Sequence, residues 1–379
     1  MLIAAIFMIT ACSSVNGKKE DISLNKVEWN TNYTYVFVHG LSGWGHYDFQ
    51  NKFFPYWGMK NGSLMKQLKK KGFKAYDASV APHGSAWDRA CELYAQLTGT
   101  RTDYGKEHSE RCGHERYGRD FSKAPLIPKW DSENKINLLG HSFGGVTERL
   151  LAHLMANGSE AERAVTAADD LSPLFAGGHS DWIYSVTALA APHNGTTAYH
   201  VPDENPESKS RMQKAMEKSY APKKDGRADY DYADFDMHIQ NADEINKWLT
   251  TLDNAYYFSF PCSATQTAKD GSQEPVKEIM EGMFQLSSKR IGSFEGLTPD
   301  GLMLGKEWQE NDGLVNTISA MAPDYAPQKS YTDALALEKG VWYIMPTYVG
   351  DHMSFQGGFT IKNNITDFYT KHLCLINQL

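Results

Sequence analysis

The sequence predicts an α/β fold with a mostly parallel central sheet and helices on both faces. Short apolar runs that favour strands alternate along the chain with segments in which apolar residues recur at helical spacing. Such alternation is typical of a parallel sheet, because each helix crosses over the sheet before the next strand begins. The chain of 379 residues is long enough to bury one large core or two smaller ones.

The individual elements follow from local composition. Strands are expected where apolar, β-branched and aromatic residues form short runs, at 33–38, 135–139, 185–190, 255–260 and 341–345. Helices are expected where apolar residues recur every three or four positions, at 61–71, 85–97, 144–156 and 241–251. We therefore expect one domain from residue 32 to residue 379.

The overall charge argues against nucleic acid as a partner. The formal net charge is -8, and no basic stripe along the sequence compensates it. The basic clusters at 69–71 and 223–224 are interpreted as solvated helix ends and loops. The composition is otherwise that of a globular protein, without repeats or low-complexity segments.

The N-terminus is interpreted as a processing segment. Residues 1–11 are apolar but too short to span a bilayer, and they end in Ile9-Thr10-Ala11-Cys12. These last four residues resemble the lipobox of bacterial lipoproteins. The resemblance implies a signal peptide (1–11), a lipid anchor on Cys12, a flexible tether (12–31) and an address at the outer membrane or cell surface. A plain secretory signal with an incidental cysteine is the alternative.

Gly140-His141-Ser142-Phe143-Gly144 carries the strongest functional signal. This Gly-x-Ser-x-Gly pentapeptide lies between an expected strand and an expected helix. A nucleophile elbow requires this context, because the two glycines permit a strained turn that presents a serine hydroxyl above the edge of a sheet. Ser142 is therefore a candidate nucleophile, whereas an ordinary serine in a glycine-rich turn is the alternative.

The loop after the first expected strand is a candidate oxyanion-binding segment. Its residues, His39-Gly40-Leu41-Ser42-Gly43, contain glycines that allow the backbone to approach a substrate closely. The predicted donors to the oxyanion are the N–H groups of Leu41 and of Phe143, the residue after the nucleophile. His39 is interpreted as an organiser of this loop.

A nucleophilic serine also needs a base and a carboxylate that orients the base. On this type of fold the acid and then the histidine follow the serine in the chain. Asp312 lies in a turn, and His352 lies just past the last expected strand. Asp351 is adjacent to His352 and is expected to point elsewhere, so Ser142, Asp312 and His352 form the predicted triad.

These segments are similar to those of a known family, the zinc-containing triacylglycerol lipases of the Bacillus and staphylococcal type, which have the α/β-hydrolase fold. The matching segments, from about residue 33 to about residue 356, are 36–45, 56–58, 87–92 and 310–317. The resemblance supports the predicted triad and implies a structural zinc ion with four protein ligands. The ligand positions it implies are Asp88, His108, His114 and Asp236. One alternative is Cys112 in place of one of these ligands, and another is a pair of surface histidines without a metal.

The resemblance also implies a zinc-bearing insertion at 84–124, a cap at 196–240 and a calcium site. In the family, calcium binds an acidic residue two positions after the catalytic histidine and another further on. Here the first position is Ser354, and residues 355–359 carry no carboxylate. A hard cation needs charged oxygen ligands, so calcium at this site is doubtful.

The sequence therefore predicts a lipase or carboxylesterase that cleaves acyl glycerol-type esters through an acyl-enzyme. A phospholipase or a polyester esterase on the same fold is the nearest alternative. A lipid-anchored binding protein without catalysis is the alternative from another class. The four cysteines after Cys12 allow three disulfide connectivities, between which the sequence does not choose; they are Cys91, Cys112, Cys262 and Cys374.

Overall fold

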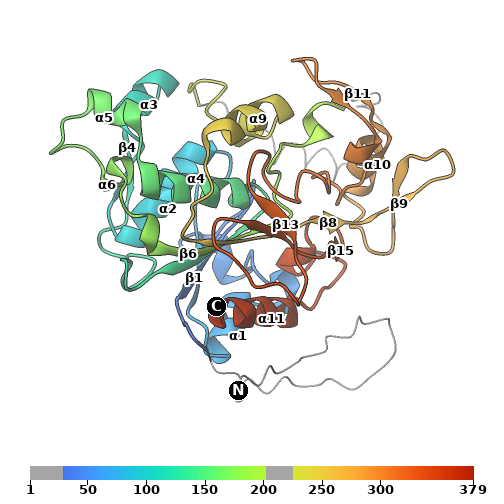
Figure 1. Ribbon diagram of the computed structural model, residues 1–379, viewed down its shortest axis with the longest axis horizontal. Helices are drawn as coiled ribbons and strands as arrows, with labels where there is room; N and C mark the ends of the chain where they lie inside the picture. Colours follow the sequence, from blue (N-terminus) through green and yellow to red (C-terminus); the bar gives the residue numbers. More distant parts are fainter. Residues whose placement is uncertain (1–28, 202–224) are drawn as a thin grey trace.

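The computed structural model describes residues 29–201 and 225–379, and a seven-stranded sheet is the centre of this part (Figure 1). All neighbouring strands in the sheet are parallel. From one edge to the other, the strands are β13 (Gln328–Ser330), β14 (Trp342–Ile344), β7 (Tyr256–Phe260), β6 (Ile183–Leu189), β5 (Ile136–His141), β1 (Thr34–Val38) and β2 (Ala75–Ala78).

Helices cover both faces of this sheet. In Figure 1, α2 and α4 lie above it and α1 and α11 lie together below it. The helices of the described residues are α1 (Leu64–Lys70), α2 (Ala86–Thr98), α3 (Lys106–Cys112), α4 (Phe143–Asn157), α5 (Glu160–Val165), α6 (Pro173–Ala176), α8 (Ala233–Asp236), α9 (Ile239–Trp248), α10 (Gln285–Ser293) and α11 (Ile365–Asn377).

Each face of the sheet has its own hydrophobic core. Side chains alternate between the two faces along a strand, so Val36 and Val38 of β1 pack with α2 and α4. Tyr35 and Phe37 of the same strand pack with α1 and α11 on the other face. Strands that are buried on both faces need apolar residues at nearly every position, which explains the short uninterrupted apolar runs in the sequence.

Within residues 29–201 and 225–379, four short strand pairs lie outside the main sheet. Three of them are antiparallel: β3 (Arg101–Asp103) with β4 (Tyr117–Asp120), β9 (Thr265–Thr267) with β10 (Gln273–Pro275), and β11 (Gly296–Leu297) with β12 (Met303–Leu304). The fourth pair, β8 (Cys262–Ser263) with β15 (Tyr348–Val349), is parallel. It brings the chain just before His352 beside the end of β7.

The predicted α/β fold is confirmed, and each strand and helix expected from the sequence is present within a few residues of its predicted bounds. In the main sheet β2 and β13 were not predicted from the sequence, and neither were the short helices α3, α5, α6, α8 and α10 or the longer α11. Apolar residues at helical spacing could have identified α11, namely Ile365, Tyr369, Leu373 and Ile376.

Several predictions concern the chain ends and the cap. The signal peptide (1–11), Cys12 and most of the tether (12–31) lie outside the described residues, as do residues 202–224 of the predicted cap (196–240). Among the described residues, none of the helices is both long and apolar enough to cross a bilayer. Cys91, Cys112, Cys262 and Cys374 are all unpaired thiols.

Candidate active site and metal-binding cluster

Ser142 occupies a strained turn between β5 and α4. Its backbone has φ 55° and ψ -130°, a conformation that non-glycine residues rarely adopt. The turn fits because Gly140 and Gly144 have no side chains. A Cβ atom on Gly144 would lie 2.3 Å from the Val38 carbonyl oxygen, and one on Gly140 would lie 2.4 Å from the backbone of α4. The structure therefore has the strand–turn–helix geometry of a nucleophile elbow.

The strand order places the loop after β1 next to this turn. β1 and β5 are neighbours in the sheet, yet the chain leaves β1 toward one edge and β5 toward the other. Such a reversal of strand order opens a crevice at the carboxyl ends of the strands, where α/β proteins bind their ligands. Leu41 and Ser142 accordingly line the same cavity. Phe143 is the first residue of α4, where a backbone N–H has no partner within the helix.

Arg89 of α2 holds the loop after β1 from beneath. Its guanidinium is fully buried and donates hydrogen bonds to the carbonyl oxygens of His39 and Ala81, the latter at 2.9 Å, and to the Thr147 hydroxyl of α4 at 2.8 Å. It also stacks over the Phe143 ring at 5.2 Å. One buried cation thus fixes residues 39–43, the predicted oxyanion-binding segment (called the oxyanion loop below), to the helix that begins after Ser142.

His39 has the organising role expected from the sequence. Its Nδ1–H donates to the Gly40 carbonyl at 2.8 Å, and its Nε2 accepts the Val80 N–H at 3.2 Å. Burial, together with the nearby Arg89 charge, lowers the pKa of His39 to about 3. A neutral ring whose two nitrogens are both engaged serves packing and not proton transfer.

Asp312 and His352 are hydrogen-bonded to each other. Nδ1 of His352 lies 2.7 Å from Oδ2 of Asp312, and the His352 backbone N–H donates to the Asp312 carbonyl at 2.8 Å. The second carboxylate oxygen, Oδ1, accepts the N–H groups of Leu314 and Val315 at 3.0 and 2.8 Å. Asp312 is 1% exposed. A carboxylate held in this way fixes the orientation of the imidazole, as a base for a nucleophile requires.

A buried polar network, which the sequence analysis did not predict, joins the two sides of the site. His141, just before Ser142, donates from Nε2 to the His352 carbonyl at 2.8 Å, so its Nδ1 is an acceptor. That atom lies 2.7 Å from the Tyr56 hydroxyl and 2.9 Å from Nε2 of Gln356. Tyr56 in turn accepts the Gly40 N–H at 3.0 Å. The network therefore connects the loop after β1, the turn at Ser142 and the loop that carries His352 (the histidine loop).

These groups open into one cavity of about 450 Å³. Ser142 and His352 lie in its wall, together with Leu41 and Tyr56. Most of the remaining lining is apolar: Trp44, Met59, Ala198, Tyr199, Val201, Met237, Ile291, Leu314, Val315 and Met353. Such a site suits a substrate that carries a hydrocarbon chain next to a reactive polar group.

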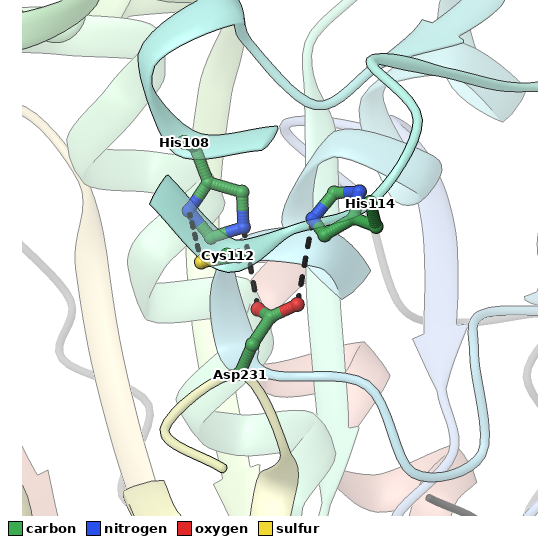
Figure 2. Close-up of side chains that lie close together, drawn as sticks. All are labelled: His108, Cys112, His114 and Asp231. Atoms are coloured by element: carbon green, nitrogen blue, oxygen red, sulfur yellow. Dashed lines mark hydrogen bonds and ion pairs between the residues drawn. The ribbon is translucent and has the colours of Figure 1, made fainter. Parts of the chain in front are cut away.

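A second cluster lies between α2, α3 and the chain before α8 (Figure 2). His108 and His114 point their Nε2 atoms at the Asp231 carboxylate, at 3.2 and 3.4 Å. Oδ1 of Asp88 lies 3.1 Å from the His108 Nε2 and 3.7 Å from the His114 Nε2. The ligand atoms of His108, Cys112, His114 and Asp231 all lie within 4.8 Å of one another. Converging nitrogen and oxygen donors of this kind can hold a metal ion.

Asp236, the fourth ligand predicted from the sequence, does not face the two imidazoles in this structure. Oδ2 of Asp236 accepts the Ala86 N–H at the start of α2, at 2.7 Å, and Asp236 is not among the clustered ligand residues. Asp231, five residues earlier, faces both imidazoles instead. Asp231 was not predicted from the sequence because acidic residues recur throughout 225–236, and their spacing does not distinguish the one that faces the histidines.

The charges around the cluster include one cation of the protein itself. Nη1 of Arg227 lies 2.6 Å from Oδ2 of Asp88 and 3.3 Å from Oδ2 of Asp231. Burial disfavours a charged imidazole, but hydrogen bonds to Asp231 and Asp88 outweigh this effect and raise the pKa of His108 to about 11. Nε2 of His114 is buried and faces the carboxylates of Asp231 and Asp88 without a well-aligned hydrogen bond. The Cys112 thiol lies 3.8 Å from the other ring nitrogen of His108, Nδ1. The two carboxylates therefore oppose the two Nε2 atoms, whereas the thiol lies on another side of His108.

The chain is similar to proteins that are named lipases and esterases. The family model described as "Lipase-like, C-terminal domain" matches residues 31–232 and 223–377. Lipase 2 of Staphylococcus aureus is 29% identical over 98% of the chain, which spans only 57% of that relative's length. EstA from Clostridium botulinum superimposes with a TM-score of 0.80, at 29% identity over 96% of this chain and 91% of that one. Staphylococcus hyicus lipase gives 0.76 at 29% identity, over 96% and 98%.

Replacement of Arg89 tests its role beneath the oxyanion loop. Arg89→Met leaves buried carbonyl oxygens without their donor, so we expect the free energy of unfolding to fall by about 3 kcal/mol. Urea denaturation measures this change. Lys66→Met, which removes an exposed cation from α1, is the matched control, with an expected change below about 0.5 kcal/mol. Equal stability of the two variants would contradict the proposed anchoring.

Replacement of the two aspartates tests the metal cluster. Asp231→Asn removes a charged ligand, so we expect the affinity for a bound metal to fall by more than about 100-fold. Asp236→Asn is the control, because an amide oxygen still accepts the Ala86 N–H. Metal content after dialysis against a chelator measures both. Retention of metal by Asp231→Asn together with its loss from Asp236→Asn would instead support Asp236, the ligand predicted from the sequence.

Proposed function

The chain belongs to the family of the lipase-like C-terminal domain, and we propose that it is a serine hydrolase that cleaves acyl glycerol-type esters. The observation that carries this proposal is that Ser142, in its strained turn, and His352 line the same mainly apolar cavity. His352 is hydrogen-bonded to Asp312. The relatives named lipases, which are longer than this chain, support the same substrate class.

In the proposed first step, the Ser142 hydroxyl attacks the ester carbonyl and His352 takes its proton at Nε2. Nδ1 of His352 faces Asp312, so the carboxylate stabilises the imidazolium that forms. The tetrahedral oxyanion accepts hydrogen bonds from the N–H groups of Leu41 and Phe143, a contribution of about 3 kcal/mol for each such donor in comparable enzymes. The alcohol then leaves with the proton from His352, and an acyl-enzyme remains.

In the second step, a water molecule attacks the acyl-enzyme. His352 removes a proton from this water and later returns it to the Ser142 oxygen as the acid is released. Both steps need the same imidazole orientation. The network through His141 and Tyr56 supports that orientation, because it ties the His352 backbone to the elbow and to the oxyanion loop.

The volume and the lining of the cavity indicate which acyl substrates it can hold. A space of about 450 Å³ with a mainly apolar wall suits an acyl chain, while Arg290 and Asp234 add charge to the wall. Phospholipids and polyesters contain the same ester group and remain the nearest alternatives. Rates on a panel of glycerol esters, phospholipids and aliphatic polyesters would separate them.

We also propose that the metal is zinc, held by Asp88, His108, His114 and Asp231. Two imidazoles and two carboxylates provide the four ligands of a tetrahedral zinc site. All four positions are protein side chains, so the ion would be structural. It would link α2 and α3 to the segment before α8. The resemblance noted in the sequence implied Asp236 in place of Asp231, and the contacts above support the exchange.

The proposal for the N-terminus rests on the sequence alone. Ile9-Thr10-Ala11-Cys12 supports removal of residues 1–11 and attachment of a lipid to Cys12. Such an anchor would hold the enzyme at a bacterial membrane surface, close to lipid substrates. Mass spectrometry of the mature N-terminus would detect the lipid.

Loss of the Ser142 hydroxyl tests the proposed chemistry. Ser142→Ala removes the nucleophile, so hydrolysis of a soluble short-chain ester is expected to fall at least about 10⁴-fold. Initial rates measure the effect, and the thermal melting curve shows whether the fold is kept. Ser122→Ala, at an exposed position away from the cavity, should retain the full rate. Undiminished turnover by a folded Ser142→Ala protein would refute the assignment.

A further inference from the structure

The loop after His352 does not fit the calcium ion that the family resemblance implies. Ser354 offers only a hydroxyl, which donates to Oδ1 of Asp351 at 3.1 Å, and residues 355–359 contain no carboxylate. The loop instead directs backbone N–H groups of residues 359–361 at a single point. N–H donors attract an anion and repel a cation, so the donor set has the wrong polarity for calcium.

The Glu281 carboxylate fills this point. Its Oε1 accepts the N–H groups of Phe359 at 2.7 Å, of Ile361 at 2.9 Å and of Thr360. Its Oε2 accepts the Thr360 hydroxyl. Glu281 is only 2% exposed. Hydrogen bonds from N–H groups to a carboxylate are about twice as strong as those between neutral groups, so one side chain can hold the whole turn.

The local backbone explains why these donors converge. Gly357 and Gly358 both have positive φ, at 107° and 72°, and they reverse the chain just before residue 359. Successive N–H groups after such a turn form a concave anion-binding surface. Burial opposes charge on Glu281, but the bonds from Thr360 and from the three N–H groups outweigh it and lower the pKa of Glu281.

Glu281 is connected to His352 through a second set of bonds. Its own backbone N–H donates to Oδ2 of Asp351 at 2.7 Å. Oδ1 of Asp351 accepts the Met353 N–H at 3.1 Å, and Asp351 is 1% exposed. Asp351 and Met353 flank His352, so Glu281 binds the loop on both sides: through Asp351 just before the histidine and through residues 359–361 after it.

The same segment also reaches the loop of the orienting carboxylate. Glu281 precedes α10, whose Ser287 hydroxyl donates to the Gly313 carbonyl at 2.6 Å. Nδ2 of Asn311 donates to the Ser288 carbonyl at 3.1 Å. Gly313 and Asn311 flank Asp312. The segment from Glu281 to Ser288 therefore contacts the neighbours of both members of the Asp312–His352 pair.

We propose that the Glu281 carboxylate, in place of a calcium ion, is the positioning residue that holds the His352 loop in its active geometry. The inference rests on the proposed function, since it takes His352 as the catalytic base. An internal carboxylate needs no ion from the medium. The active geometry is consequently independent of calcium.

Glu281→Gln is the direct test, because glutamine keeps the size of the side chain but loses its charge and places an NH₂ group among N–H donors. We expect kcat on a soluble short-chain ester to fall by about 10- to 100-fold while KM changes less than about twofold, since misplacement of a catalytic group affects the chemical step. Glu278→Gln, an exposed acid three residues earlier, is the matched control and should leave both constants unchanged.

The response of the wild-type protein to calcium is the second test of the proposal. Wild-type kcat and melting temperature should be the same in millimolar calcium and in a calcium chelator. Activation or stabilisation of the wild type by calcium would overturn the proposal, and so would an unchanged kcat in Glu281→Gln. If Glu281→Gln does not fold, Thr360→Val removes only the hydroxyl contact, and we expect a smaller loss of kcat in the same direction; an unchanged kcat would again overturn it.

A spectroscopic readout separates this proposal from the proposed function. The imidazole signal of His352 in a proton–carbon NMR spectrum can be identified by its loss in His352→Gln. It should move in Glu281→Gln and stay in place in Glu278→Gln, even if the wild type cleaves no ester. An inert wild type would refute the proposed function. A His352 signal that does not move in Glu281→Gln would refute the positioning role of Glu281.

Discussion

The strained backbone at Ser142 is the constraint on which the rest of the candidate site depends. A non-glycine residue at positive φ costs of the order of 1–3 kcal/mol and persists only when its surroundings enforce it. Here β5 is buried between β1 and β6 and α4 begins at the next residue, while Gly140 and Gly144 leave space that no other residue would. The cost is therefore offset by the packing of the sheet itself, and the serine hydroxyl has little freedom to move away from the cavity.

The loops around this turn are fixed by buried polar groups more than by apolar packing. Arg89 holds the oxyanion loop, His141 and Tyr56 connect that loop to the backbone of His352, and Glu281 binds the histidine loop on both sides. Buried groups of this kind are costly unless fully hydrogen-bonded, and each of them has several partners. Together they hold the oxyanion loop, the turn at Ser142 and the loop of His352 in fixed positions relative to one another.

The sequence predicted the elements whose signals are local. The strand, the glycine pair and the helix around Ser142 are contiguous, and Asp312 and His352 follow in the order that this fold requires. β2 was not predicted, because its residues Ala75-Tyr76-Asp77-Ala78 include a buried carboxylate and become a strand by pairing with β1. Tertiary pairing of this kind has no signature in a four-residue window.

The contacts of Asp231 and of Glu281 were not predicted from the sequence for a related reason. Asp231 and Asp236 are both acidic and lie five residues apart, and only the path of the chain decides which one faces His108. Likewise, no spacing rule connects Glu281 with residues 359–361, because their contact depends on a turn about 80 residues further along the chain. Long-range contacts between polar groups are the part of this site that sequence patterns do not encode.

The most direct measurement of the central claim is covalent labelling with a fluorophosphonate, followed by peptide mass spectrometry. An activated serine reacts quickly with this reagent, so we expect one adduct per chain, located on Ser142, and much slower labelling in His352→Gln. Absence of an adduct from the folded protein, or an adduct on a different residue, would contradict the proposed catalytic machinery.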